Sequence, residues 1–135
     1  MCDWVSPPPV LSSAFRAVNA NGEVGRSGYL FKVYLPDVNG DGVAEEDGFA
    51  NIDADTAETT WCAYTWPSNY GTSGNRAFFV SQAGDILTTE DANYSGSGSG
   101  PLPGAAFDAG GNNSIAGNTA GGTSGQDNNL WKQAG

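Results

Sequence analysis

Four short runs of β-branched and aromatic residues, separated by turn residues, most constrain how this chain can fold. The run GYLFKVYL places Tyr29, Phe31, Val33 and Leu35 on one side of an extended strand and Lys32 on the other, because successive side chains alternate. The runs TTWCAYTW, NRAFFVSQ and DILTT follow, the last two joined by a short QAGD turn. The pattern predicts an antiparallel four-stranded meander. Its strands are expected at residues 27–35, 59–66, 75–82 and 85–89.

The same alternation predicts which side chains form the inner face of the sheet. These are Phe31, Val33, either Trp61 or Cys62, Phe79 and Ile86. The fold class is therefore mainly β, or α+β with one short helix.

The helix candidate is PPPVLSSAFRAVNANG, residues 7–22, which has prolines at its start and Asn-Gly at its end. Its second half, FRAVNANGEV, is equally compatible with the start of a hairpin.

Composition changes near residue 95. Residues 96–135 are rich in Gly, Ser and Asn, so they offer few side chains to offset the entropy of ordering them. We interpret residues 1–95 as the core and residues 96–135 as a long irregular segment. That segment either packs back onto the core or forms a disordered tail. The apolar residues available to pin it are Leu102, Phe107, Ile115, Leu130 and Trp131.

Charge and apolar content exclude several classes of partner. Fifteen acidic residues face five basic ones, for a net charge of −10, which argues against nucleic acid and anionic membrane surfaces. No apolar run approaches the roughly 20 residues of a membrane helix, and no signal-peptide pattern follows Met1. We therefore expect no membrane contact by the chain as given. Cys2 and Cys62 either form one disulfide or are a buried Cys62 and an incidental Cys2.

The sequence offers little material for catalysis. It contains no histidine, which is the usual acid–base residue near neutral pH, so Cys62 has no histidine to activate it. Asp53 and Asp55 are a possible carboxylate pair, but their spacing suits solvated or metal-facing side chains better. No glycine-rich phosphate loop is present. We predict that the chain is not an enzyme.

The most acidic stretch of the chain resembles a calcium loop. Eight of the fifteen acidic residues lie between Asp37 and Glu58, with no basic residue among them. In the numbering of an EF-hand loop, an oxygen ligand would come from each of the first, third, fifth, seventh and ninth positions. With Asp47 added, the candidate calcium ligands are Asp37, Asn39, Asp41, Val43 (through its carbonyl), Glu45 and Asp47.

The match to a calcium loop is incomplete. The twelfth position, which normally supplies a bidentate carboxylate, is Gly48. Asp47, Asp53 or Asp55 would have to supply the last oxygen. The alternative is an acidic turn, in which Asn and Asp side chains accept hydrogen bonds from nearby backbone N–H groups.

Two stretches, GYLFKVYLP and WCAYTWPSNYGTSGNRAFFVSQAGDI, carry a family resemblance. They resemble the globular headgroup of bacterial prepilin-type proteins, which are similar to type II secretion pseudopilins and type IV pilins. The resemblance covers roughly residues 12–94, with a weaker echo in NNLWKQ. The matching residues are Ala63, Trp66, Pro67, Tyr70, Gly71, Ser73, Gly74, Arg76, Phe78, Phe79, Val80, Gln82, Gly84 and Asp85.

The resemblance implies an extracytoplasmic structural subunit that contacts copies of itself or other pilin-like proteins. Members of that group begin with a leader and a long apolar helix, and the sequence given shows neither. We therefore expect a headgroup that cannot by itself build a filament with a helical core. The alternative is a calcium-dependent extracellular binding or adhesion module that uses exposed aromatic side chains. Exposure of Trp4, Trp61, Trp66 and Trp131 would distinguish the two functions.

Overall fold

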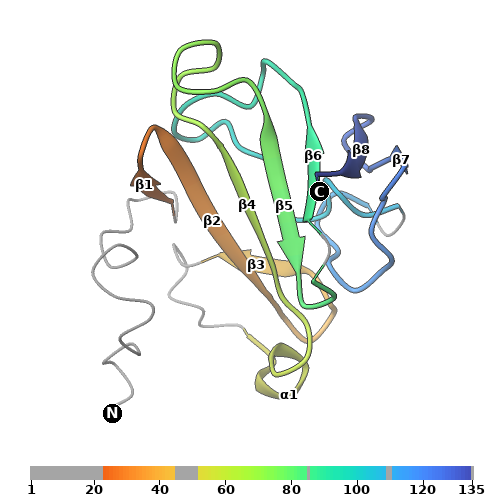
Figure 1. Ribbon diagram of the computed structural model, residues 1–135. Coiled ribbons are helices and arrows are strands. Elements are labelled where there is room, and N and C mark those ends of the chain that lie inside the picture. The colour runs from red at the N-terminus through yellow and green to blue at the C-terminus, as the bar shows by residue number, and fades with distance from the viewer. Residues whose placement is uncertain (1–22, 45–51, 85, 109–110, 135) are drawn as a thin grey trace, which may run out of the picture.

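The computed structural model describes residues 23–44, 52–84, 86–108 and 111–134, which form one antiparallel sheet (Figure 1). The strand order is β1-β2-β4-β5-β6-β8-β7, and β3 pairs with the outer edge of β2. The elements are β1 (Val24–Arg26), β2 (Tyr29–Pro36), β3 (Gly42–Ala44), α1 (Ala54–Ala57), β4 (Cys62–Pro67), β5 (Ala77–Ser81), β6 (Ile86–Thr89), β7 (Thr123–Ser124) and β8 (Leu130–Gln133).

The prediction of a mainly β fold is confirmed, and the prediction of a four-stranded meander is wrong. The four expected strands are β2, β4, β5 and β6, and they are neighbours in the expected order. The sheet also contains β1, β3, β7 and β8, which are two to four residues long. Strands this short show too few alternations to be recognised by period. The helix candidate at residues 7–22 lies outside the described residues.

Tight turns set the register of the first strands. Ser27 and Gly28 connect β1 to β2 with φ angles of 57° and 84°. Two consecutive positive φ values define a type I′ turn, whose twist matches that of a two-stranded ribbon. The predicted turn after β5 is also present, since the Gly84 N–H donates to the Ser81 carbonyl at 2.9 Å.

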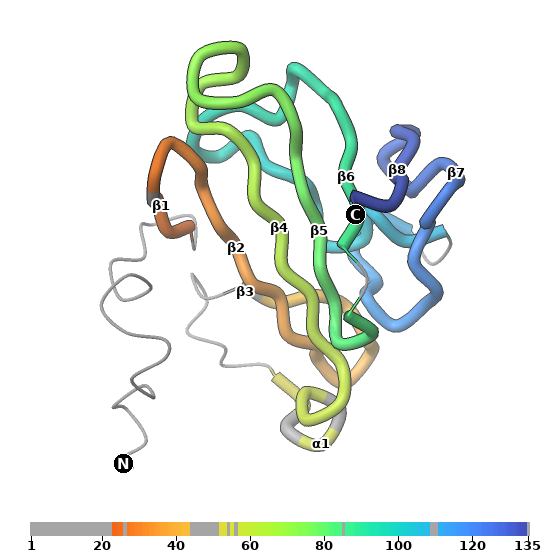
Figure 2. The backbone as a smooth tube through the Cα atoms, in the orientation of Figure 1, coloured from red at the N-terminus to blue at the C-terminus, as the bar shows by residue number. Residues whose placement is uncertain are grey.

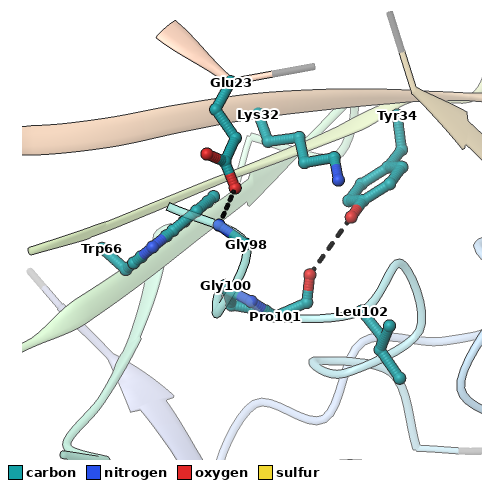
Figure 3. A pocket seen from close by; sticks show the side chains of 8 residues that line it. All are labelled: Glu23, Lys32, Tyr34, Trp66, Gly98, Gly100, Pro101 and Leu102. Carbon is teal, nitrogen blue, oxygen red and sulfur yellow. Dashed lines mark hydrogen bonds between the residues drawn. The ribbon is translucent and has the colours of Figure 1, made fainter. Parts of the chain in front are cut away.

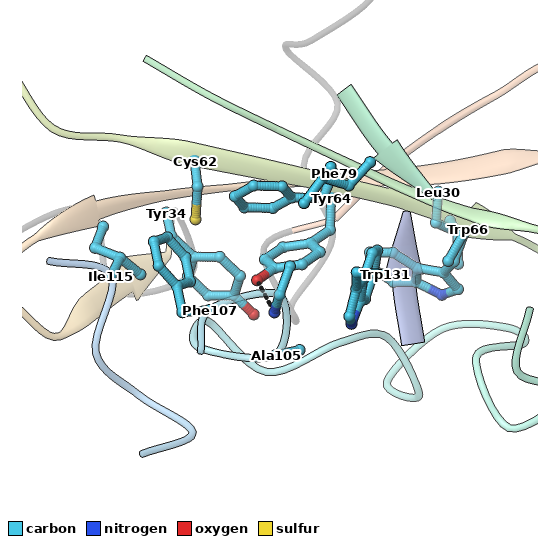
Figure 4. Close-up of a cluster of buried hydrophobic side chains, with 13 residues drawn as sticks. Leu30, Tyr34, Cys62, Tyr64, Trp66, Phe79, Ala105, Phe107, Ile115 and Trp131 are labelled. Carbon is cyan, nitrogen blue, oxygen red and sulfur yellow. Dashed lines mark hydrogen bonds between the residues drawn. The ribbon is translucent and has the colours of Figure 1, made fainter. Parts of the chain in front are cut away.

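The core lies between the sheet and the C-terminal segment. Figure 4 shows the inner-face side chains pointing at residues of that segment. The ring centroids of Tyr64 and Phe79 are 5.0 Å apart, and Phe79 meets Phe107 edge-to-face at 5.4 Å. Trp131 lies 6.0 Å from Tyr64. The buried cluster is Leu30, Tyr34, Cys62, Tyr64, Trp66, Ala77, Phe79, Leu87, Ala105, Ala106, Phe107, Ile115 and Trp131.

The predicted inner face of β2 is wrong. Leu30 and Tyr34 point into the core, whereas Val33 is 38 % exposed and Phe31 lies on the same side as Val33. Changing the side that faces inward is equivalent to a one-residue shift, which moves every side chain to the other face. Lys32 made the inward side look polar, but its ammonium lies 5.4 Å from the centroid of the Tyr34 ring, so its stem packs along the sheet.

Of the other inner-face predictions, those for β4 and β5 are correct and the one for β6 is wrong. Phe79 is buried as predicted, and Cys62 rather than Trp61 faces the core. Ile86 is wrong, because it is 50 % exposed while its neighbour Leu87 is completely buried.

The C-terminal segment packs on the inner face instead of forming a tail (Figure 2). Phe107, Ile115 and Trp131 anchor it, whereas Leu102 and Leu130 are each 54 % exposed. Its glycines allow close approach, since a Cβ on Gly100 would lie 2.3 Å from a ring atom of Trp66.

Polar tips of aromatic side chains hold the backbone of this segment. Tyr64 Oη donates to the Pro103 carbonyl at 2.7 Å and accepts from the Ala106 N–H at 3.0 Å. The Trp66 indole N–H donates to the Gly96 carbonyl at 3.0 Å. Buried backbone groups in a segment with little regular structure need such partners.

A second polar cluster fixes β8 to the chain after β6. Asp127 accepts hydrogen bonds from Tyr94 Oη at 2.5 Å, from Asn129 Nδ2 at 2.9 Å and from the Trp131 indole N–H at 3.1 Å. The Asn129 side chain also donates to Asp91 at 2.7 Å. The cluster positions Trp131 over the inner face.

Candidate functional site

The predicted calcium loop begins as the β2–β3 hairpin. The Asp37 N–H donates to the Asp41 carbonyl at 2.9 Å, and the Gly40 N–H donates to the Asp37 carbonyl at 3.0 Å. Gly40 has a φ of 84°, so the connection is a type I turn followed by a left-handed residue. The carboxylate of Asp37 accepts the N–H groups of Asn39 at 2.8 Å and Asp41 at 3.0 Å. One oxygen of the first predicted ligand is therefore used to form the turn.

The remaining predicted ligands are only partly described. Val43 pairs with Leu35 in the hairpin ladder, and Glu45 and Asp47 lie outside the described residues. Within the described ranges, no three acidic, cysteine or histidine side chains form a group that could hold a metal ion.

A second acidic segment approaches the hairpin through its backbone. Ile52 forms a β-bridge with Asp37, and the Asp53 N–H donates to the Pro36 carbonyl at 3.0 Å. Asp55 follows in α1 and is exposed. The backbone of Ile52 and Asp53 therefore lies beside the hairpin, and Asp53 is one of the three candidates for the last calcium oxygen.

A small cavity opens beside β1 and β2 (Figure 3). Its volume is about 120 Å³, slightly less than an engineered cavity of roughly 150 Å³ that holds benzene. The buried carboxylate of Glu23 accepts hydrogen bonds from Ser97 Oγ at 2.7 Å and the Gly98 N–H at 2.9 Å. Tyr34 Oη donates to the Pro101 carbonyl at 3.2 Å. These polar groups fasten the glycine-serine loop to the sheet, which is a structural role.

Burial raises the pKa values of Cys62, Tyr64 and Tyr94, which favours their neutral forms. Cys62 has no exposed surface and forms no disulfide within the described residues, and burial raises the pKa of its thiol far above the usual range. A buried neutral thiol is a poor nucleophile. Burial likewise raises the pKa of Tyr94, helped by its hydrogen bond to Asp127. Cys2 lies outside the described residues, so its pairing with Cys62 stays a prediction.

The three tryptophans in the described residues do not form the exposed platform expected of an adhesion module. Trp66 and Trp131 have no exposed surface, and Trp61 is partly buried. Trp4 lies outside the described residues.

The most unusual surface is the side of the sheet opposite the core, which we call the outer face. Figure 1 shows that the C-terminal segment lies behind the sheet, away from this face. The strand register forms two rows across it, one with Phe31, Thr65, Phe78 and Thr88 and one with Val33, Ala63, Val80 and Ile86. On the central strands the outer face comprises Tyr29, Phe31, Val33, Leu35, Ala63, Thr65, Phe78, Val80, Ile86 and Thr88, none of which is charged. Charged residues border it on the flanking strands, where Arg26 pairs with Tyr29 and Lys132 pairs with Thr88.

Comparison with known proteins adds no relative. No family model, curated protein or solved structure matches this chain. Among the described residues, none of the helices has the length and hydropathy needed to cross a membrane.

Proposed function

We propose that this chain is the non-catalytic headgroup of a pilin-like structural subunit, which acts through protein–protein contacts. The observation that carries the proposal is the largely apolar outer face of the central strands, which Arg26 and Lys132 border on the flanking strands. A sheet with one solvated face normally alternates apolar and polar residues, yet both faces of β2, β4 and β5 are built largely from apolar and aromatic side chains. Such a sheet is suited to packing between two layers.

Only one of those layers comes from the described residues. The C-terminal segment covers the inner face, and the outer face leaves Val33 38 % and Ile86 50 % exposed. Contiguous apolar surface of this kind is typical of an interaction site. The outer face of the headgroup is therefore suited to packing against another polypeptide. We propose that the headgroup belongs to an extracytoplasmic assembly.

The partners proposed are copies of this chain or other pilin-like proteins. The net charge of −10 disfavours nucleic acid, because phosphate neutralisation needs basic side chains.

Site-specific photo-crosslinking in the producing organism tests this function. A photoreactive residue is placed at one exposed apolar position at a time, and adducts are identified by mass. The positions are Val33, Val38, Ile86, Leu102 and Leu130. We expect adducts with this chain or with pilin-like subunits from at least one of them, and none from Thr72, an exposed polar control. An absence of protein adducts at all five positions would overturn the proposal.

A calcium-dependent binding module is the second candidate. It is favoured by the hydrogen bond between the Asp53 N–H and the Pro36 carbonyl, which places a second acidic segment beside Asp37. The ligands proposed are those of the sequence prediction, from Asp37 to Asp47, with affinity on the order of 10⁻⁴ to 10⁻³ M, as in extracellular modules.

Thermal unfolding tests this second candidate. Millimolar calcium should raise Tm relative to chelator at constant ionic strength, and Asp41→Ala should abolish the increase. Magnesium at the same concentration is the control, since it demands a stricter octahedral geometry. An unchanged Tm in calcium would leave the loop as an acidic turn.

A further inference from the structure

We propose that Asn93 is the acceptor of an N-linked oligosaccharide, and that Asp91 is the residue by which a bacterial oligosaccharyltransferase selects it. The inference rests on the proposed function only for its extracytoplasmic location, because such enzymes act outside the cytoplasm. It depends on the sequence around Asn93, on the turn that contains this residue and on the position of that turn in the fold.

The sequence around Asn93 has the form that these enzymes recognise. Asn93, Tyr94 and Ser95 fit the acceptor motif, in which asparagine is followed by any residue except proline and then by serine or threonine. Bacterial enzymes of this class also require an acidic residue two positions before the asparagine, and Asp91 occupies that position. Asn112 also begins an acceptor motif, but the residue two positions before it is a glycine. The longer form of the motif therefore selects Asn93.

Asn93 lies in a tight turn that leaves it exposed. The Asp91 carboxylate accepts the Asn93 N–H at 2.9 Å, and the Asp91 carbonyl accepts the Tyr94 N–H at 3.0 Å. An Asp side chain that bonds the backbone two residues on is typical of a turn. Ala92 and Asn93, at the centre of this turn, are both exposed. An exposed turn is the structural setting that the acceptor motif requires.

The residues that follow Asn93 hold the turn in place. Tyr94 donates its hydroxyl to Asp127 at 2.5 Å, and its ring packs against the buried cluster. Ser95 is partly exposed, and its hydroxyl oxygen accepts the Tyr70 N–H at 2.9 Å. The Asn93 side chain is therefore presented from a fixed base. An oligosaccharide on it would extend into solvent without displacing a core side chain.

The position of the turn leaves the outer face uncovered. β6 ends at Thr89, which pairs with Ala77, whereas the β2–β3 hairpin adjoins the opposite ends of the strands. Figure 1 shows the chain after β6 crossing the end of the sheet away from that hairpin. Because Tyr94 packs on the inner side, a modified Asn93 is compatible with the contacts proposed for the outer face.

The transfer balances without an oxidant or a reductant. The donor is an oligosaccharide joined to a polyprenyl diphosphate. The Nδ2 atom of Asn93 attacks the anomeric carbon of the first sugar, a C–N bond forms, and the bond from that carbon to the diphosphate oxygen breaks. The polyprenyl diphosphate leaves, and the amide loses one proton. Because an amide nitrogen lone pair is delocalised into the carbonyl, it is a weak nucleophile, and the step needs the enzyme.

Glycopeptide mapping by mass spectrometry, on the chain isolated from the producing organism, tests the inference directly. We expect an oligosaccharide on the peptide that contains Asn93 and none on the peptide that contains Asn112. An unmodified Asn93 would overturn the inference.

A bacterial host that expresses an oligosaccharyltransferase and its lipid-linked oligosaccharide tests the selection of Asn93. The full chain is exported to the periplasm, and the occupancy of Asn93 is measured from the intact mass. Occupancy should disappear in Asn93→Gln, a change at an exposed position, and in a host whose enzyme is inactive. Asp91→Asn leaves the acceptor motif intact and should lower occupancy at least tenfold.

Asn129→Ala is the matched control for the structural role of Asp91. It removes the hydrogen bond between Asn129 and the Asp91 carboxylate but leaves the sequence around Asn93 unchanged, so occupancy should stay within twofold of the parent. Equal occupancy in Asp91→Asn and the parent would overturn the inference, as would modification of Asn112 to the same extent as Asn93. Neither result affects the photo-crosslinking test of the proposed function.

Discussion

Tyr64 performs two structural roles through one side chain. Its ring contacts Phe79 and Trp131 in the core, and its hydroxyl bridges Pro103 and Ala106 of the C-terminal segment. The burial that these contacts require raises the pKa of Tyr64 well above its usual range, and the neighbouring Cys62 adds to the increase. The neutral phenol can therefore donate and accept at the same time.

Phe79 tests the assignment of the inner face. Replacing Phe79 with Ala should lower the free energy of unfolding by about 3–5 kcal/mol, because a buried ring is lost and a cavity remains. Phe78→Ala is the matched control on the outer face, where the ring is partly exposed, and it should cost less. Urea denaturation of both variants is the measurement. Equal losses would contradict the assignment of faces.

Cys62 tests the assignment of its buried thiol. In a Cys2→Ser protein, the thiol should not react with a maleimide under native conditions at neutral pH, and should react once the chain is denatured, because burial keeps it neutral and inaccessible. Rapid native labelling would refute this. The parent protein, denatured without reductant, should react at two thiols if both cysteines are free and at none if they form a disulfide.

At the scale of elements, a single residue organises the β2–β3 hairpin. Asp37 joins the turn through its N–H, its carbonyl and its carboxylate. Asp37→Ala should lower the free energy of unfolding by about 1–2 kcal/mol, since two hydrogen bonds to a charged group are lost. Measured in chelator, this loss reports on the turn independently of calcium. Asn39→Ala, at an exposed position, is the control, and a loss as large as that of Asp37→Ala would contradict the argument.

At the scale of the whole molecule, the buried neutral acids make stability depend on alkaline pH. Cys62, Tyr64 and Tyr94 all have folded-state pKa values raised by burial. Above an unfolded pKa of about 8.5 for Cys and about 10 for Tyr, the unfolded chain releases protons that the folded chain retains. Stability should therefore be complete below about pH 8 and fall as the pH rises through 9 to 11.

Urea midpoints across this range provide the measurement. Tyr94→Phe should make the decline above about pH 10 less steep, because it removes one of the titrating groups. A midpoint that stays constant up to pH 11 would show that these groups titrate alike in both states.

Local chemistry in the sequence was enough to predict the central strands and some of their turns. Period-2 runs located β2, β4, β5 and β6, and the glycine in QAGD located the turn after β5. These features depend on a few neighbouring residues, whose backbone preferences act over the same short range. Phe79 was assigned correctly to the core for the same reason.

Only the tertiary structure decided which face of the sheet is inward and what the C-terminal segment does. Both sides of β2 are apolar, so alternation alone could not choose between Val33 and Tyr34. Contacts with Phe107, Ile115 and Trp131, more than 70 residues further along the chain, made that choice. The glycine-rich segment is ordered because aromatic hydroxyl and indole groups of the sheet satisfy its backbone. Those partners become neighbours only after the chain has folded.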